Sequence, residues 1–297
     1  ILGVVTDDVL FMHVCSRSTW WSKGTVAVVT GANKGIGFAI VKRLAELGLT
    51  VVLTARDVEK GKAAVESLKA QGLDVAFCRL DVAEPSSIQA FASWLRQTFG
   101  GLDILVNNAG VSFNEIDSNS VQHAETVMRT NFYGPKRLIE VLLPSFRRSN
   151  AASRILNISS QLGLLNKLRN NTWKALLEDE ERLSEADIEQ MVSQFLDQVK
   201  DGSWEEGGWP MVWTDYAVSK LALNAYSRLL AKQHEGRALS VNCFCPGFTR
   251  TAMTRGQGSR TAEEAADFAA MLMLLPPDQL PTGKFFKLST RSPYSKL

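Results

Sequence analysis

Short apolar, β-branched runs alternate with longer helical patterns along most of the chain, from Thr25 onward. The runs read VAVVT, TVVLT, DVAFCRL, DILVNN, RILNIS, SVNCFC and GKFFKL. Between them we expect helices at about 36–47, 58–70, 86–99, 121–148, 215–233 and 262–275. This alternation is typical of a parallel sheet with helices on both faces. The sequence therefore predicts an α/β fold with a doubly wound parallel sheet.

Length and composition favour one large domain. The chain has 297 residues, of which 45% are hydrophobic and 22% charged, as in soluble globular proteins. We assign residues 25–297 to a single domain and residues 1–24 to an N-terminal extension of unknown role. A formal charge of +2 without a basic stripe argues against nucleic acid as a partner. No apolar run reaches the roughly 18 residues of a membrane span.

The four cysteines are Cys15, Cys78, Cys243 and Cys245, and they lack the C-x-x-C spacing of zinc or redox sites. Their number is too low for a disulfide scaffold, which favours a reducing compartment. Cys243 and Cys245 would share one face of a strand, where core packing is the favoured interpretation over metal binding. We therefore expect no metal site.

An insertion at about 162–213 interrupts the strand–helix rhythm. It contains an amphipathic helical pattern, with apolar residues at Ile188, Met191, Val192, Phe195, Leu196 and Val199. The segment from Ser184 to Asp187 resembles a capping box, Lys200 suits the last turn, and Gly202 suits the end of the helix. Three tryptophans follow, Trp204, Trp209 and Trp213, which either wall a pocket or fasten the insertion to the domain.

The first strand runs into a glycine-rich turn, TGANKGIG, at 30–37. Thr30, Gly31, Gly35 and Gly37 stand between a strand and a helix that starts near Ile36. Glycines there allow the backbone to approach a pyrophosphate, whose charge the helix N-terminus stabilises. Because the turn lies near the start of a βαβ unit, the sequence predicts a dinucleotide-binding Rossmann fold.

The end of the second strand bears on the choice of dinucleotide. An acidic residue there would bind a ribose hydroxyl, whereas an arginine accommodates a 2′-phosphate. Arg56 occupies this region with Asp57 after it, and Lys34 lies inside the glycine-rich turn. Both cations favour NADP(H) over NAD(H); the alternative is that they are ordinary surface charges.

The segment TDYAVSK places Tyr216 and Lys220 four residues apart, on the same face of a helix. A fixed positive charge near a phenol lowers its pKa, which suits a general acid or base at neutral pH. The alternative interpretation is a solvated helix face, because this spacing is common.

Five motifs in this order, TGANKGIG, NNAG, NISS, YAVSK and CPGFTRT, resemble the short-chain dehydrogenase/reductase family from about Thr25 to Leu288. The long insertion before the tyrosine resembles the monomeric carbonyl reductase branch, which includes plant menthone and salutaridine reductases. Ala252 departs from the pattern, because relatives often have an acidic residue after the position of Thr251.

The resemblance implies four catalytic residues. Tyr216 would be the proton donor, and Lys220 would lower its pKa and bind the nicotinamide ribose. Ser160 would hydrogen-bond the substrate carbonyl, with Ser159 as a neighbour that helps hold the site. Asn131 would keep a water molecule beside the lysine.

The resemblance also implies a cofactor site along the carboxyl ends of the strands. Asp81 and Val82 would border the adenine, Asn108, Ala109 and Gly110 would lie under its ribose, and Pro246, Gly247 and Thr251 would hold the nicotinamide end. Together with the residues from the glycine-rich turn, the expected contacts to NADPH or NADP+ are Gly31, Asn33, Lys34, Gly35, Ile36, Gly37, Arg56, Asp81, Val82, Asn108, Ala109, Gly110, Tyr216, Lys220, Pro246, Gly247 and Thr251.

The expected activity is NADPH-dependent reduction of an apolar ketone or aldehyde to an alcohol. The alternative is an NAD(P)-binding sensor or scaffold without turnover, against which the complete catalytic set argues. Expected pocket residues are Phe113, Trp204, Trp209 and Met253.

The resemblance further implies a monomer, whose inserted helix covers the association surface of compact relatives and roofs the pocket. Ser295, Lys296 and Leu297 form the tripeptide that the peroxisomal import receptor reads at a free C-terminus, which favours the peroxisome over the cytosol.

Overall fold

The computed structural model describes residues 19–114, 119–147 and 153–288. Seven strands form one sheet in the order β3-β2-β1-β4-β5-β6-β7, and each neighbouring pair is parallel. The strands are β1 (Val26–Val29), β2 (Thr50–Ala55), β3 (Ala76–Arg79), β4 (Ile104–Asn107), β5 (Ser153–Ile158), β6 (Leu239–Cys245) and β7 (Phe285–Lys287). The expected doubly wound sheet is confirmed, and its order reverses between β1 and β4, where such sheets bind ligands.

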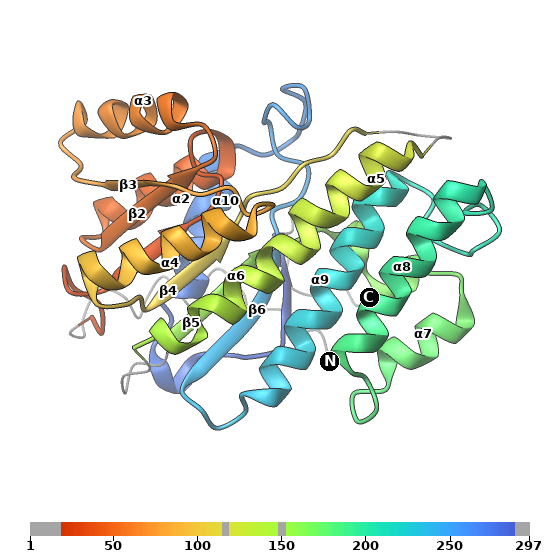
Figure 1. The fold of residues 1–297 in the computed structure, drawn as a ribbon. Coiled ribbons are helices and arrows are strands. Elements are labelled where there is room, and N and C mark those ends of the chain that lie inside the picture. The colour runs from red at the N-terminus through yellow and green to blue at the C-terminus, as the bar shows by residue number, and fades with distance from the viewer. Residues whose placement is uncertain (1–18, 115–118, 148–152, 289–297) are drawn as a thin grey trace.

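The sheet has one apolar core on each face. Because side chains alternate along a strand, Val26 and Val28 of β1 enter one core, while Ala27 and Val29 enter the other. Figure 1 shows the helices that cover the two faces. One core is closed by α2 (Gly35–Glu46), α3 (Val58–Lys69) and α10 (Ala262–Met273), and the other by α4 (Pro85–Phe99), α5 (Val121–Met128), α6 (Gly134–Leu142) and α9 (Thr214–Gln233).

The prediction of one continuous helix over 121–148 is wrong in both length and continuity. It is divided into α5 and α6 by a π-helical turn at Arg129–Tyr133, and α6 ends at Leu142 in a short 3-10 turn. Gly134 donates its backbone N–H to the carbonyl of Arg129, a bond across five residues. Pro135 follows at the start of α6 and has no N–H to continue the α-helical pattern, which accounts for the break.

The helix predicted within the insertion is confirmed as α8 (Glu185–Asp201). Its capping box joins Ser184 and Asp187, and Gly202 ends it in the left-handed region at φ 83°. Its buried face packs against α9 and α5, which α8 flanks in Figure 1. The insertion contains a second helix that the sequence did not predict, α7 (Asn171–Glu178), which Asn170 caps.

Two sets of contacts fasten the insertion to the domain. Lys136 on α6 forms ion pairs with Glu140 of its own helix and with Glu185 and Glu189 of α8. Trp209 is 1% exposed, and its indole Nε1 donates to Gln198 Oε1 at 2.8 Å. Of the two roles open to the tryptophans, Trp209 therefore has the fastening role.

Residues at the end of the expected N-terminal extension contact the domain. Trp20 and Trp21 donate their indole N–H groups to the carbonyls of Leu274 and Leu47, the residues that end α10 and α2. The guanidinium of Arg154 lies 3.7 Å from the centroid of the Trp20 ring. Residues 19–24 thus close the end of the sheet opposite the strands' carboxyl ends.

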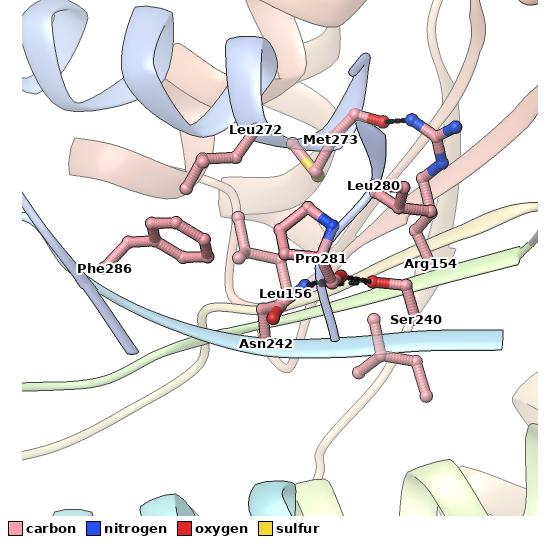
Figure 2. A pocket seen from close by; sticks show the side chains of 10 residues that line it. Arg154, Leu156, Ser240, Asn242, Leu272, Met273, Leu280, Pro281 and Phe286 are labelled. Atoms are coloured by element: carbon pink, nitrogen blue, oxygen red, sulfur yellow. Dashed lines mark hydrogen bonds between the residues drawn. The ribbon is translucent and has the colours of Figure 1, made fainter. Parts of the chain in front are cut away.

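A cavity of about 10 Å³ lies near this end, lined by residues that include Arg154, Ser240 and Phe286. Figure 2 shows Arg154 directed to the carbonyl of Met273 and Ser240 bonded to the carbonyl of Pro281. The cavity is no larger than a water molecule needs, so it is not a substrate site.

Two sequence predictions fall outside the described residues. Cys15 and the C-terminal tripeptide, Ser295 to Leu297, belong to the segments 1–18 and 289–297. Within the described ranges, no helix combines the length and the apolar character that crossing a bilayer requires.

Candidate active site

The loops after β1 and β4 are joined by hydrogen bonds at the carboxyl edge of the sheet. Thr30 Oγ1 accepts from the backbone N–H groups of Asn108 and Ala109, both at 3.0 Å. In return, Asn108 Nδ2 donates to the carbonyls of Thr30 at 2.9 Å and Gly31 at 3.1 Å. The glycine-rich turn and the NNAG segment therefore form one hydrogen-bonded unit, which we call the ledge, at the point where the strand order reverses.

The glycines of the turn are required by close backbone approach. A Cβ atom on Gly31 would lie 2.8 Å from the Cα of Ala109, and one on Gly37 would lie 2.4 Å from Asn108 Nδ2. Gly31 and Gly35 both have φ of 60°, a region that side chains disfavour. We call this turn and the N-terminus of α2 the cradle, because backbone N–H groups at the start of a helix can bind a pyrophosphate.

The loop after β6 faces this cradle. A Cβ atom on Gly35 would lie 3.6 Å from Thr251 Cγ2, so Thr251 borders the glycine-rich turn. Pro246 and Gly247 precede it directly after β6, and Gly247 has φ of 76°. The segments expected to contact the pyrophosphate and the nicotinamide end of the cofactor are therefore neighbours.

The two cations expected to bind a 2′-phosphate are exposed at the ends of β2 and of the turn. Lys34 is the N-cap residue of α2, and Arg56 directly follows β2. Neither forms an ion pair with any residue that the structure describes. Asp57 Oδ1 accepts from the Lys60 backbone N–H at 3.0 Å and caps α3, so this carboxylate is already used in the fold.

The other expected cofactor contacts flank the cradle. Asn33 and Ile36 are partly exposed within the turn and at the start of α2. Asp81 Oδ1 accepts from the Ala83 N–H at 3.0 Å, which fixes the loop after β3. Val82 is buried, and its carbonyl would lie 2.9 Å from a Cβ atom on Gly134, so it packs tightly on the start of α6.

Tyr216 and Lys220 lie one turn apart on α9, as expected. Lys220 is 4% exposed, and its Nζ donates to the carbonyl of Ile158, the last residue of β5, at 2.8 Å. The same Nζ lies 5.5 Å from the centroid of the Tyr216 ring. The helix and the end of β5 thus bring an ammonium, a phenol and the Ser160 segment together.

The expected lowering of the tyrosine pKa is not what the structure gives. Burial raises the pKa of Tyr216, with a further contribution from Cys245, and a hydrogen bond with Ser160 opposes the rise only in part. Burial also lowers the pKa of Lys220 to about 8, against the opposing effects of Cys243 and Cys245. Burial favours the neutral form of both groups and is the largest cause of both pKa shifts.

The adjacent serines have different surroundings. Ser159 is 2% exposed and donates its hydroxyl to Asn224 Oδ1 at 2.6 Å, which ties the end of β5 to α9. Ser160 accepts from the Leu162 N–H at 3.2 Å and also bonds the Tyr216 side chain. Ser160 is therefore the serine that faces the phenol, and Ser159 braces it.

Asn131 lies at the centre of the π-helical turn and is fully buried. Its side-chain amide bonds both backbone groups of Val111, at 2.8 and 2.9 Å, and also donates to Ser219 Oγ. A Cβ atom on Gly110 would lie 3.4 Å from Asn131 Oδ1 and 3.8 Å from Lys220 Nζ. Asn131 therefore fixes the loop that passes the lysine, whereas a water held beside Lys220 stays a prediction.

Both cysteines of β6 lie behind this group, as core packing predicts. Each is 3% exposed, and Cys245 Sγ accepts from the Gln161 backbone N–H at 3.2 Å. Burial raises the pKa of the Cys243 thiol to about 11. These thiols support the turn after Ser160 and are protonated at neutral pH.

The expected pocket residues are only partly brought to the site. Trp209 is buried in the core, so the expected pocket role is wrong for this residue. Trp204 is only partly buried where it packs against the core, and its pocket role stays a prediction. Phe113 is 39% exposed and stacks on His123 at a centroid distance of 3.7 Å. Asn114 Nδ2 donates a hydrogen bond of 2.8 Å to the backbone carbonyl of Met253, which links the loops after β4 and β6 across the site.

Sequence reasoning missed a buried polar chain beneath the site. Asn107 donates to Asn157 at 2.8 Å, and Asn157 donates to Ser227 at 2.7 Å, which connects β4, β5 and α9. The signal was present, because an asparagine near the end of an otherwise apolar buried strand needs a partner. The apolar pattern used to identify the strands does not predict such hydrogen bonds between buried polar side chains.

Comparison with known proteins gives a consistent result. Residues 25–175 and 207–262 match the family described as short chain dehydrogenase. The (+)-neomenthol dehydrogenase of Arabidopsis thaliana is 40% identical over 284 residues, covering 88% of this chain and 95% of that protein. Carbonyl reductase (NADPH) 3 of Mus musculus is 41% identical over 275 residues, covering 90% and 94%.

The fold is also similar to a solved structure, salutaridine reductase from Papaver somniferum. The two superpose with a TM-score of 0.83 at 38% identity, covering 89% of this chain and 100% of that chain.

Proposed function

Because this chain belongs to the short chain dehydrogenase family, we propose that it reduces the carbonyl group of an apolar ketone or aldehyde with NADPH, using Tyr216 as proton donor. The relatives named above are a carbonyl reductase, a salutaridine reductase and a neomenthol dehydrogenase. Their names support oxidoreduction at a carbonyl or alcohol carbon.

The observation that carries the proposal is the convergence of two independent sets of residues. The backbone cradle formed by Gly31, Gly37 and Asn108 lies at the same sheet edge as Ser160, Tyr216 and Lys220. Gly110 connects the two, because it is the last residue of the ledge and approaches Lys220 Nζ. A dinucleotide seated in the cradle can therefore extend to the phenol.

The protein's contribution to the reaction follows from the protonation states. NADPH, when bound, supplies the hydride, and the protein supplies position and a proton. Burial raises the pKa of Tyr216, so its phenol is protonated at neutral pH and can donate to the substrate oxygen. Ser160 shares that oxygen as a second hydrogen-bond partner, which helps most when negative charge develops there.

Lys220 has a second task. With its pKa lowered to about 8, it remains mainly an ammonium at pH 7. One of its protons is directed at the Ile158 carbonyl, which fixes the side chain in place. The other two can donate to the ribose hydroxyls of the cofactor and to the phenol, whose anion the ammonium stabilises after proton transfer.

Preference for NADPH over NADH is supported by the two exposed cations at the cradle. Lys34 and Arg56 are exposed and make no ion pair within the described residues, so both are available to a 2′-phosphate. Asp57, the nearest acid, caps α3 instead of facing a ribose.

The rival function, a cofactor-binding sensor or scaffold, requires only the cradle. Turnover of NADPH with a panel of ketones and aldehydes, followed by nicotinamide absorbance, separates the two functions. Binding of NADPH without oxidation by any carbonyl in the panel would favour the rival.

Tyr216→Phe tests the proposed proton donor. The ring is retained, so the fold and NADPH affinity should persist while carbonyl reduction falls by about 10²-fold or more, as is typical for loss of a general acid. Tyr226→Phe is the matched control, because it removes the same hydroxyl from a tyrosine of the same helix that is buried in the core. A Tyr216→Phe enzyme as active as the control would refute the mechanism.

A further inference from the structure

The residue directly before the catalytic helix has an unusual backbone conformation. Trp213 is the N-cap residue of α9 and has φ 49° and ψ 59°, in the left-handed region. A bulky residue is uncommon there, because its Cβ approaches the following carbonyl; glycine or asparagine adopts this conformation at lower cost. Such strain persists where the side chain has another role.

That role is not helix capping. Trp213 makes no side-chain capping bond, and the first turn of α9 is instead bonded by Asp215, whose Oδ1 accepts from the Tyr216 N–H at 2.6 Å. The role is not fastening of the insertion either. Trp173 and Trp209 serve there, donating their indole Nε1 to Gln194 and Gln198 at 3.0 and 2.8 Å.

The indole of Trp213 is placed beside the proposed proton donor. Its ring centroid lies 6.4 Å from that of Tyr216, with 81° between the two planes. Unlike the indoles of Trp173 and Trp209, it makes no hydrogen bond to any residue that the structure describes, and it remains partly exposed. Met211 and Val212, which precede it, are 53% and 51% exposed.

We propose that Trp213 is a specificity-determining residue, whose indole forms a flat apolar wall beside Tyr216 that favours rigid, ring-containing ketones. This inference rests on the proposed carbonyl reduction. A rigid ring can cover the indole face without losing internal rotations, whereas a linear chain must lose several to make the same contact. The wall therefore selects by shape, and the strained backbone is what places it beside the Tyr216 ring.

The test compares two ketones with the same number of carbon atoms, the bicyclic 2-decalone and the linear 2-decanone. The wild-type protein should have the higher kcat/KM with the bicyclic ketone. Trp213→Gly relieves the backbone and removes the wall, so the ratio of the two kcat/KM values should fall about tenfold, mainly because the bicyclic ketone acquires a higher KM. Trp213→Phe keeps a flat ring and should retain the ratio within about threefold. Met211→Ala is the control for an exposed apolar neighbour and should leave it unchanged.

Two results would overturn the inference. An equal fall of kcat for both ketones in Trp213→Gly would mean that the indole only positions Tyr216, and an unchanged ratio would mean that it does not contact the substrate. Circular dichroism and NADPH affinity establish that the variant is folded.

If the wild-type protein reduces no carbonyl at all, the proposed function fails separately. Equilibrium dialysis of the bicyclic ketone with NADP+ present then tests the wall by itself. Weaker binding to Trp213→Gly than to wild type supports it, and equal binding refutes it.

Discussion

Replacement of Lys220 by methionine should stabilise the protein at neutral pH while abolishing turnover. Burial lowers the pKa of Lys220 from 10.5 to about 8, which at about 1.4 kcal/mol per unit corresponds to roughly 3 kcal/mol against keeping the ammonium folded. Methionine removes this cost but leaves the Ile158 carbonyl without its 2.8 Å donor, a loss of about 1–2 kcal/mol. The expected gain at pH 7 is therefore about 1–2 kcal/mol.

The pH dependence is the sharper part of this prediction. Between the folded pKa of about 8 and the unfolded value of 10.5, the unfolded chain holds more protons at Lys220 than the folded one. The free energy of unfolding contributed by Lys220 must therefore rise with pH across this window, by about 2 kcal/mol from pH 7 to pH 9.5. Urea denaturation of wild type and Lys220→Met at both pH values should show their difference change by that amount.

Lys136→Met provides a control, because the pKa of Lys136 is shifted in the opposite direction to that of Lys220. Although burial lowers its pKa, hydrogen bonds to Glu140 and Glu185 raise the pKa of Lys136 above its ordinary value overall. The stability that the charged Lys136 contributes to the fold is fully present below pH 10.5 and is lost only at higher pH. The difference in free energy of unfolding between wild type and Lys136→Met should therefore stay constant from pH 7 to pH 9.5. If the difference in free energy of unfolding between wild type and Lys220→Met is equally constant, burial does not lower the pKa of Lys220.

Three further predictions concern the cofactor and the assembly. Gly37→Ala should lower the free energy of unfolding by about 1–3 kcal/mol and weaken NADPH binding, because its Cβ would meet Asn108 Nδ2 at 2.4 Å. Denaturation and fluorescence titration measure the two effects, and Gly24→Ala is the control at a glycine without such a close contact. Arg56→Ala should lower kcat/KM for NADPH about tenfold and leave that for NADH unchanged, and an equal effect on both would show that Arg56 does not bind the 2′-phosphate. The outer face of α5 and α9 is covered by α8, so sedimentation at several concentrations should show a monomer, and a stable tetramer would contradict this.

The strands and the order of the site motifs were predictable because both are local in the sequence. Apolar runs between turn residues identify buried parallel strands, and the turn at 30–37 needs glycine wherever a backbone must pass closely. The break after Tyr133 was also readable, since Pro135 cannot continue a helix, but the apolar periodicity on both sides concealed it. The insertion was predicted with one helix where it has two, because α7 is short and its apolar face is narrow.

The properties that depend on distant neighbours were not predictable. Whether Trp209 or Trp213 lies near the site depends on how the insertion returns to α9, which the sequence does not state. The same limit applies to the protonation of Tyr216. A lysine one turn away suggests a lowered pKa, but the extent of burial decides the outcome, and burial is a property of the whole fold.

The two indoles at the start of the described chain bear on how this protein can be shortened. Trp20 and Trp21 supply donors to carbonyls at the ends of α10 and α2, and the Trp20 ring covers Arg154. The guanidinium of Arg154 is so buried that its pKa falls to about 9. A version trimmed to Thr25, where the family match begins, would leave both helix ends and this cation uncovered. Crystallisation or display of the protein should therefore start from a chain that keeps Trp20 and Trp21.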